Sequence, residues 1–271
     1  MNKIVLSFLL LLYQPLAAQT DTSFRLVRSI NLVSADFAVD KLENLYVLTT
    51  GDQLKKFSSA GDSMAVFNDV RRFGKLHSFD VSNPLKPLLF YKDFSTIVLL
   101  DRQLSLRGSI DLRKQNIIQV SAAARSYDNN IWLFDALDNK LKKVGENGTL
   151  LLETPDFRTI FSEAFVPEKI IDHDNSLYLF APGLGVMQFD YFGTFQKKFV
   201  LPQWQNISLL QKNLIGTTSG SISLFNTSNL MMQHQYQFPS SFGSFNQYLI
   251  GNSQLFARTK DSINIYSFRF Y

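Results

Sequence analysis

The sequence repeats itself at intervals of about 40 residues. A short apolar and aromatic run, typical of a buried strand, begins at residues 44, 87, 130, 176, 213 and 254. A second apolar group begins about ten residues after each start, as Leu54–Phe57 does in the first repeat. Such repeats are typical of propeller blades, because one blade cannot bury both faces of its sheet alone and must stack against neighbours. The pattern predicts an all-β fold, a six-bladed β-propeller of four-stranded antiparallel blades.

The fourth repeat shows the pattern most completely. It contains Pro167, the turn cluster Asp172–Asn175, the strand Leu177–Phe180 and the hairpin sequence Asp190-Tyr-Phe-Gly193, whose spacing is that of a tight turn. These residues resemble the NHL-type family of six-bladed propellers. The resemblance runs from about residue 34 to the C-terminus, and the last two repeats lack the Asp-x-x-Gly turn. The resemblance implies the fold and no particular activity.

The two ends of the repeat region complement each other. The sixth repeat stops after its third strand, near residue 268, whereas Phe24–Leu32 reads as a strand without a neighbour. We therefore predict that Phe24–Leu32 pairs with the last blade and closes the ring, which removes an exposed sheet edge. The alternative is a disordered leader. The predicted blades are 33–68, 78–112, 118–152, 169–200, 207–238 and 245–268 with the leading strand.

The N-terminus indicates export. Lys3 precedes about ten apolar residues and then Ala17-Ala18-Gln19, the pattern of a cleaved signal peptide. We predict a signal peptide at 1–19 and a single domain at 20–271, located in the periplasm or at the outer membrane with no transmembrane span in the mature chain. The sequence has no Cys, which excludes disulfides and lipid attachment through an N-terminal Cys. This leader and the composition resemble those of exported Bacteroidota-type proteins.

Charge gives little support to nucleic-acid binding. The chain has 27 basic and 23 acidic residues, so removal of Lys3 leaves 26 against 23, a formal charge of +3. That excess is small for a nucleic-acid-binding protein, and export argues further against such a partner.

The connections between blades hold the predicted binding residues. Connections from each outer strand to the next inner strand emerge at one end of a propeller, and here they combine arginines with aromatics, a composition enriched in recognition surfaces. The predicted binding face consists of Arg71, Arg72, Phe73, Arg158, Phe161, Trp204 and Phe242. The alternative is that the aromatics pack between blades and the arginines are only solvated.

Catalytic and metal motifs are weak. The three His, at positions 77, 173 and 234, fall in different repeats, and Asp172-His173-Asp174 is favoured as a turn rather than a ligand set. No Gly-x-Ser-x-Gly motif or Cys supplies a nucleophile. Six-bladed lactonases resemble this architecture and bind a cation on the axis, but no inward acidic residue repeats here. We expect no cofactor and no metal site.

The sequence thus predicts an exported, non-catalytic β-propeller that acts as a protein-binding or scaffold module in the cell envelope. The alternative is an enzyme, a metal-dependent hydrolase or lactonase-like propeller with its site on the central axis. Three or more carboxylate or amide oxygens converging at one mouth of the channel would favour the enzyme. An exposed patch of aromatics and arginines would favour binding.

Overall fold

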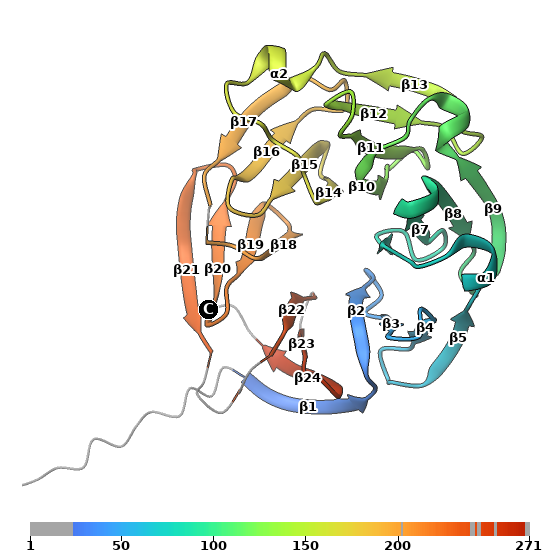
Figure 1. The fold of residues 1–271 in the computed structure, drawn as a ribbon. Helices are drawn as coiled ribbons and strands as arrows, with labels where there is room; N and C mark the ends of the chain where they lie inside the picture. Colours follow the sequence, from blue (N-terminus) through green and yellow to red (C-terminus); the bar gives the residue numbers. More distant parts are fainter. Residues whose placement is uncertain (1–23, 202, 239–241, 243–244, 252–253, 269–271) are drawn as a thin grey trace, which may run out of the picture.

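A computed structural model of the chain describes residues 24–201, 203–238, 242, 245–251 and 254–268. The predicted signal peptide at 1–19 lies outside the described residues. The described chain forms six four-stranded antiparallel sheets arranged in a ring around a central axis (Figure 1). The predicted fold class, the number of blades and the number of strands per blade are therefore confirmed.

Each of the first five blades is a consecutive meander, in which each strand pairs with the next. The first three are β2 (Ser34–Val39), β3 (Leu45–Thr49), β4 (Leu54–Phe57) and β5 (Ser63–Phe67); β6 (Ser78–Asp80), β7 (Leu88–Tyr91), β8 (Thr96–Leu100) and β9 (Leu106–Asp111); and β10 (Val120–Arg125), β11 (Ile131–Asp135), β12 (Lys140–Val144) and β13 (Leu150–Glu153). The next two are β14 (Lys169–His173), β15 (Ser176–Ala181), β16 (Gly185–Phe189) and β17 (Phe195–Phe199); and β18 (Asn206–Leu210), β19 (Asn213–Thr217), β20 (Ser221–Asn226) and β21 (Met231–Gln237).

The sixth blade joins the two ends of the chain. It consists of β22 (Gln247–Ile250), β23 (Gln254–Arg258), β24 (Ser262–Phe268) and, on the outside, β1 (Phe24–Asn31). Ile30 lies opposite Ile263 in the antiparallel pair, and the Ser29 hydroxyl donates a 2.7 Å hydrogen bond to Asn264 Oδ1. The predicted ring closure is confirmed. It gives the last blade the outer strand that its own repeat does not supply.

The second strand of each blade is buried on both faces, because neighbouring blades cover both sides of its sheet. Leu45, Tyr46, Val47 and Leu48 of β3 are all at most 4% exposed. Such a strand reads as a continuous apolar run rather than an alternating one. This burial explains why the second strands were the most visible repeat in the sequence.

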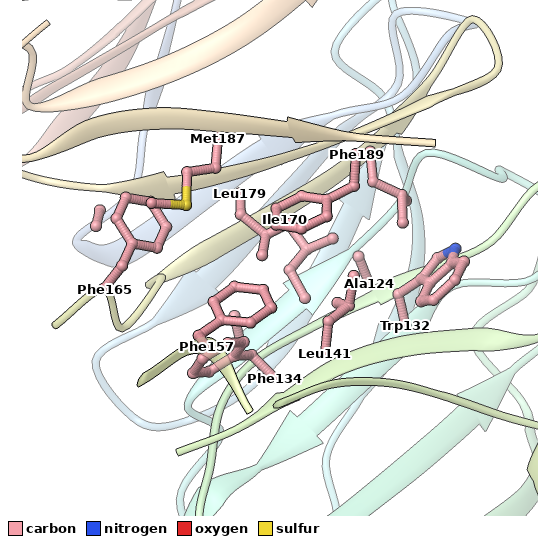
Figure 2. Packing of buried hydrophobic residues seen from close by; sticks show 13 residues of the cluster. Ala124, Trp132, Phe134, Leu141, Phe157, Phe165, Ile170, Leu179, Met187 and Phe189 are labelled. Atoms are coloured by element: carbon pink, nitrogen blue, oxygen red, sulfur yellow. The ribbon is translucent and has the colours of Figure 1, made fainter. Parts of the chain in front are cut away.

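Aromatic residues fill the wedges between blades. Between the third and fourth blades, Phe157 packs edge-on against Phe134 and stacks on Phe189, with ring centroids 5.2 Å apart in both pairs (Figure 2). Phe157 opens the short helix α2 (Phe157–Ile160), and Phe165 follows in the same connection. Both are at most 1% exposed. The connection between blades therefore supplies core residues that the sheets lack.

The direction of the strands divides the loops between two ends of the ring. Turns joining first to second and third to fourth strands lie at one end, which we call the turn face. Turns joining second to third strands lie at the other end together with the connections between blades, and we call it the connection face. The remaining short helices, α1 (Val70–Phe73), η1 (Lys92–Phe94) and η2 (Leu112–Gln115), belong to the connection face. Figure 1 shows the ring viewed along its central axis, which runs from one face to the other.

Candidate functional site

The structure does not bring the three predicted arginines together. Arg71 and Arg72 lie on α1, between the first and second blades, and Arg158 lies on α2, between the third and fourth. The two helices occupy different sectors of the ring (Figure 1). All three side chains are exposed. Binding by these arginines stays a prediction, for separate positions rather than one patch.

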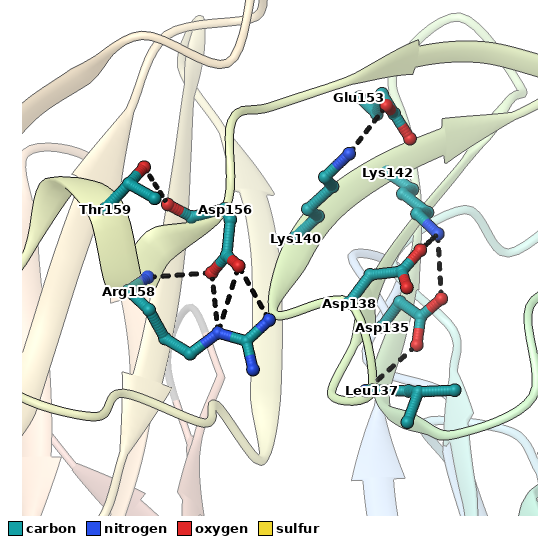
Figure 3. Close-up of polar contacts among 9 residues, drawn as sticks. All are labelled: Asp135, Leu137, Asp138, Lys140, Lys142, Glu153, Asp156, Arg158 and Thr159. Carbon is teal, nitrogen blue, oxygen red and sulfur yellow. Dashed lines mark hydrogen bonds and ion pairs between the residues drawn. The ribbon is translucent and has the colours of Figure 1, made fainter.

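Arg158 already has a partner on its own helix. Its Nε lies 2.9 and 3.0 Å from the two carboxylate oxygens of Asp156, and its Nη2 lies 2.6 Å from Asp156 Oδ2 (Figure 3). Asp156 also accepts from the Arg158 backbone N–H and so caps the helix. These hydrogen bonds raise the pKa of Arg158 and lower the pKa of Asp156. A ligand at this position would have to share the guanidinium with Asp156.

The four predicted aromatics lie between blades rather than on the surface. Phe73, Trp204 and Phe242 are 5%, 4% and 7% exposed, and Phe161 is half-buried against Phe157 and the next blade. The expectation of an exposed aromatic patch on the connection face is therefore wrong. Each connection crosses the wedge between two sheets, and its aromatic residue fills that wedge because burying a large ring stabilises the pair.

Trp204 shows how closely these aromatics pack. It lies directly on Gly216 of β19, where a Cβ atom would stand 1.8 Å from the indole ring. Because any side chain at position 216 would overlap the ring, the glycine is what allows Trp204 to enter the core. This contact fixes the connection between the fourth and fifth blades.

A depression lies on the opposite end of the ring, the turn face. It surrounds the mouth of the axis and has a volume of about 770 Å³. The turns between the first and second strands of blades one to five line it, together with Tyr191 from the turn between β16 and β17 of blade four. Its residues include Lys41, Asn83, Arg125, Tyr127, Asp172 and Lys212.

Asp172 links blades three and four at the rim of this depression. Its Oδ2 accepts hydrogen bonds of 3.1 Å from the Ser126 hydroxyl and the Tyr127 backbone N–H, both in blade three. Its Oδ1 accepts a 2.5 Å hydrogen bond from the Tyr191 hydroxyl. Burial and this hydrogen bond to Asp172 raise the pKa of Tyr191 above its ordinary value. The carboxylate thus fixes both tyrosines.

The two tyrosines form the aromatic part of the depression. The rings of Tyr127 and Tyr191 stack with centroids 4.4 Å apart and an interplanar angle of 12°. Tyr127 is 67% exposed, and Phe192, beside Tyr191, is 83% exposed. An exposed ring held by a neighbouring ring and a carboxylate loses little conformational freedom on binding, which favours contact with a partner.

Lys143 of β12 contacts the turn between β10 and β11, which carries Tyr127. Its Nζ lies 2.6 Å from Asp128 Oδ2 and stands over the rings of Trp132 and Tyr127, 4.8 and 5.3 Å from their centroids. Partial burial alone would raise the pKa of Asp128, but hydrogen bonds from Lys143 and Asn130 outweigh it and lower the pKa to about 2. Asp128 is therefore charged at neutral pH and holds the lysine in place.

The predicted turn in this segment consists of Asp174 and Asn175, whereas Asp172 and His173 are the last residues of β14. Asp174 and Asn175 have φ angles of 47° and 59°, the left-handed values of a tight turn. His173 Nε2 lies 2.7 Å from the Gln211 carbonyl oxygen of the next blade. In the part of the chain that the structure describes, no group of three or more His, Cys, Asp or Glu side chains is placed to hold a metal ion.

The axis mouth on the connection face is smaller and filled with internal hydrogen bonds. Asp36, Asn206 and Gln247 line a pocket of about 250 Å³ there. Each of the three residues has an oxygen that already accepts a hydrogen bond. Asn206 Oδ1 accepts from Lys169 Nζ over 3.0 Å, and Gln247 Oε1 accepts from Arg258 Nε over 3.1 Å. Asp36 Oδ1 accepts from Gln247 Nε2 over 2.7 Å. Burial lowers the pKa of Lys169, against the opposing effect of Asp36 and Asp80.

Comparison with solved structures identifies the fold. Virginiamycin B lyase from Staphylococcus aureus matches with a TM-score of 0.63 at 11% identity, over 91% of this chain and 100% of that chain. The Pan2 WD40 domain from Neurospora crassa matches with a TM-score of 0.65 at 10% identity, over 92% and 96%. The fold is that of a β-propeller. The β-propeller domain of Cps50 (Swd1) from Myceliophteria thermophila also matches, with a TM-score of 0.61 at 8% identity, over 91% and 100%.

These similarities extend to the fold alone, because identities near 10% carry no site residues across. No protein-family model and no curated protein sequence matches the chain. The similar structures include an enzyme as well as a WD40 domain. No helix in the described residues has the length and hydropathy to cross a membrane.

The sequence reasoning missed Tyr127 and Tyr191. Each stands beside an aspartate in a turn, Tyr127 before Asp128 and Tyr191 after Asp190, and the two turns belong to successive blades. This shared pairing of a tyrosine with an aspartate was the signal in the sequence. It indicates a common site only once the turns between first and second strands and those between third and fourth strands are known to lie on the same face of the ring.

Proposed function

We propose that the mature protein is an exported, non-catalytic binding module of the cell envelope, and that a protein partner docks on the turn face over the axial depression. The observation that carries this proposal is the stacked pair Tyr127–Tyr191, in which Asp172 holds the half-buried Tyr191 and Tyr127 is exposed at the rim. Tyrosine is enriched among residues that dominate protein–protein binding energy.

The surroundings of the pair suit a protein surface. Three large apolar residues, Leu42, Tyr127 and Phe192, are 64%, 67% and 83% exposed on turns of this face. Lys41 and Lys212 add positive charge at the depression. Apolar anchors inside a polar rim are the usual composition of such interfaces. The loops come from several blades, so the surface is broad and held by a rigid ring.

Site-specific photocrosslinking tests the placement. A photoreactive residue is introduced at Tyr127 or Phe192 on the turn face and, as matched controls, at Arg71 or Arg158 on the connection face. We expect the same protein adduct from positions 127 and 192 in native envelopes and none from 71 and 158. Adducts only from 71 and 158 would move the interface to the predicted arginines. Absence of a discrete adduct at all four positions would reject the binding module.

Export and family are part of the same proposal. The sequence pattern of residues 1–19 supports cleavage after Gln19, and the turn Asp190–Gly193 supports the NHL-type relationship. Cell fractionation with N-terminal sequencing of the recovered protein tests the first point. A mature chain that begins at Thr20 in the periplasmic or outer-membrane fraction is expected. A full-length chain in the cytoplasmic fraction would contradict it.

The enzymatic alternative has one observation in its favour. Carboxylate and amide groups of Asp36, Asn206 and Gln247 meet at the mouth on the connection face. A cation there would have to replace Lys169 and Arg258, which now donate to two of these groups. Titration calorimetry with Mg²⁺, Ca²⁺ and Zn²⁺ tests this site. Stoichiometric binding that is lost in Asp36→Asn would favour the enzyme.

A further inference from the structure

A second depression on the turn face lies between the second and third blades and shares Arg125 with the axial one. Its volume is about 600 Å³, which is within the usual range of small-molecule sites. The connection between β6 and β7, the turn between β8 and β9, and blade three each contribute to it. Its principal residues are Leu85, Lys86, Arg102, Arg107, Arg125 and Glu146.

Positive charge exceeds negative charge in this pocket. Two carboxylates, Asp101 and Glu146, face four cationic side chains, those of Lys86, Arg102, Arg107 and Arg125. In the described chain, neither Arg102 nor Arg107 forms an ion pair with a carboxylate. The pocket therefore has two guanidinium groups available to an incoming anion.

The Asp101 carboxylate is committed to its own turn. Its Oδ1 accepts 2.9 Å hydrogen bonds from the backbone N–H groups of Gln103 and Ser105. These backbone hydrogen bonds lower the pKa of Asp101, with a further contribution from Arg107. Asp101 thus shapes the turn that presents Arg102 and Arg107, and it forms no hydrogen-bonded pair with either guanidinium.

Arg125 is the buried member of the cluster. Its side chain is 2% exposed, and its Nη1 donates to Glu146 Oε1 over 2.9 Å and to the Asn129 carbonyl over 2.8 Å. Its Nη2 donates to the Lys86 carbonyl over 3.2 Å, and its Nε has no partner among the described residues. Burial of a guanidinium is costly unless a carboxylate compensates it.

The carboxylate that forms an ion pair with the Arg125 guanidinium is shared with a second cation. Glu146 is 42% exposed, and the Oε1 atom that pairs with Arg125 also lies 3.3 Å from Lys86 Nζ. One half-exposed carboxylate therefore serves two cations. This arrangement leaves a positive potential at the pocket wall in addition to the two unpaired guanidinium groups.

The remaining wall is apolar. Leu85 is 61% exposed, and Leu99 and Leu100, which are 7% and 1% exposed, also line the pocket. A Cβ atom at Gly108 would meet no other atom within 4 Å, so the pocket is open at that point. A ligand that fills this space needs an apolar part beside its charged groups.

We propose that this pocket binds a small organic anion, one that carries two or more carboxylate or phosphate oxygens for Arg102 and Arg107 and an apolar part that packs on Leu85. Guanidinium groups pair with planar carboxylates and with phosphates through two parallel hydrogen bonds, so both chemistries fit. This site adjoins the proposed protein-binding surface and shares Arg125 with it, but its test uses small anions and does not depend on a protein partner.

Titration calorimetry at constant ionic strength of about 0.15 M tests the site. The probes are isophthalate, phenyl phosphate and the uncharged isophthalamide. We expect saturable binding of at least one of the two anions and none of isophthalamide. The anion that binds more tightly distinguishes carboxylate from phosphate chemistry. Failure of both anions to saturate, or equal binding of isophthalamide, would overturn the proposal.

Matched double variants separate the pocket from general charge. Arg102→Gln/Arg107→Gln removes two charges from the pocket, and Lys92→Gln/Lys260→Gln removes two exposed charges from the connection face. We expect the first to weaken binding by about tenfold or more and the second to leave it within about twofold. Equal loss in both variants would contradict the site.

Glu146→Gln provides a variant that should gain affinity. It removes the competing carboxylate and leaves the buried Arg125 and Lys86 to the ligand, so tighter anion binding is expected. Weaker binding in Glu146→Gln would mean that the carboxylate is needed, and this result would overturn the proposal. Circular dichroism melts of all variants confirm that the ring is intact in each.

Discussion

The Tyr191 hydroxyl donates a 2.5 Å hydrogen bond to Asp172, and the other oxygen of that carboxylate binds the Ser126 hydroxyl and the Tyr127 N–H of the preceding blade. One carboxylate therefore links two blades and positions both rings of the stacked pair. Because the contact runs between blades, its loss affects the stability of the ring as well as the proposed binding surface.

We predict that Asp172→Ala lowers the free energy of unfolding by about 1–3 kcal/mol, since it leaves partly buried donors without an acceptor. Urea denaturation measures the change. Asp174→Asn is the matched control in the same turn, because asparagine tolerates the left-handed backbone of Asp174, and it should change stability by less than about 0.5 kcal/mol. Equal effects of both substitutions would show that Asp172 acts only through the turn.

The contact between Trp204 and Gly216 gives a prediction with an internal control. Gly216→Ala places a methyl group against the indole ring and should cost about 1–3 kcal/mol by overpacking. Gly108→Ala, where the added Cβ meets nothing within 4 Å, should be close to neutral. Thermal unfolding followed by tryptophan fluorescence measures both. A neutral Gly216→Ala would show that the connection can move aside.

Lys142 is a buried cation, and we predict that its ion pairs contribute to the stability of the fold. Its Nζ lies 2.8 Å from Asp135, whose side chain is 1% exposed, and it also pairs with Asp138, which is 45% exposed (Figure 3). Lys142→Met leaves the buried Asp135 without its cation and should cost about 3–5 kcal/mol. Asp138→Asn removes only the exposed partner and should cost less than about 1 kcal/mol. Chemical denaturation of both variants checks this order, and the reverse order would contradict it.

Buried tyrosines predict a loss of stability in alkali. Burial raises the pKa of Tyr91, Tyr191 and Tyr248, the last to about 12 with a contribution from Tyr266. Their pKa in the unfolded chain is about 10, so the folded state holds these protons more tightly. The associated stability is complete below about pH 10 and decreases as the pH rises through the folded values. Urea midpoints between pH 8 and 12 measure it, and Tyr248→Phe should reduce the slope.

The pairing of β1 with β24 can be tested with a disulfide, because the chain has no native Cys. Ser29→Cys/Asn264→Cys joins two residues that face each other in the register and whose side chains are hydrogen-bonded. The loop that it closes covers most of the chain, so stabilisation of up to about 4–5 kcal/mol is expected. Ser29→Cys/Ser267→Cys is the mismatched control, because Ser267 lies opposite Arg25. Free-thiol assays and melting temperatures distinguish the two.

The fold could be predicted from the sequence because its main signal is periodic. The second strands, such as Leu45–Thr49 and Ile131–Asp135, are buried on both faces and keep the same apolar pattern in each blade. The ring closure followed from counting strands, since the sixth repeat lacked one and the predicted strand Phe24–Leu32 was left over. Both arguments use local pattern and number, which a single sequence contains.

The candidate site could not be predicted in the same way. Phe73, Trp204 and Phe242 were placed on the correct connections, but sequence does not show whether a loop aromatic faces solvent or the adjacent wedge. Lys142 and Lys143 are adjacent charged residues of β12, yet both are buried because they pair with Asp135 and Asp128 from other segments of the same blade. The direction in which such side chains point depends on how strands and neighbouring sheets pack. A repeat pattern in the sequence does not contain this information.

The pairing of β1 with β24 also has a consequence for incomplete chains. During synthesis, β1 emerges early and has no partner until Ser262–Phe268 follows. A product truncated before β24 would expose β1 and β23 as two unsatisfied edges, in the form that proteases and holdase chaperones recognise. Protection of β1 therefore depends on synthesis of β24, because β1 pairs with no other strand in the described part of the chain.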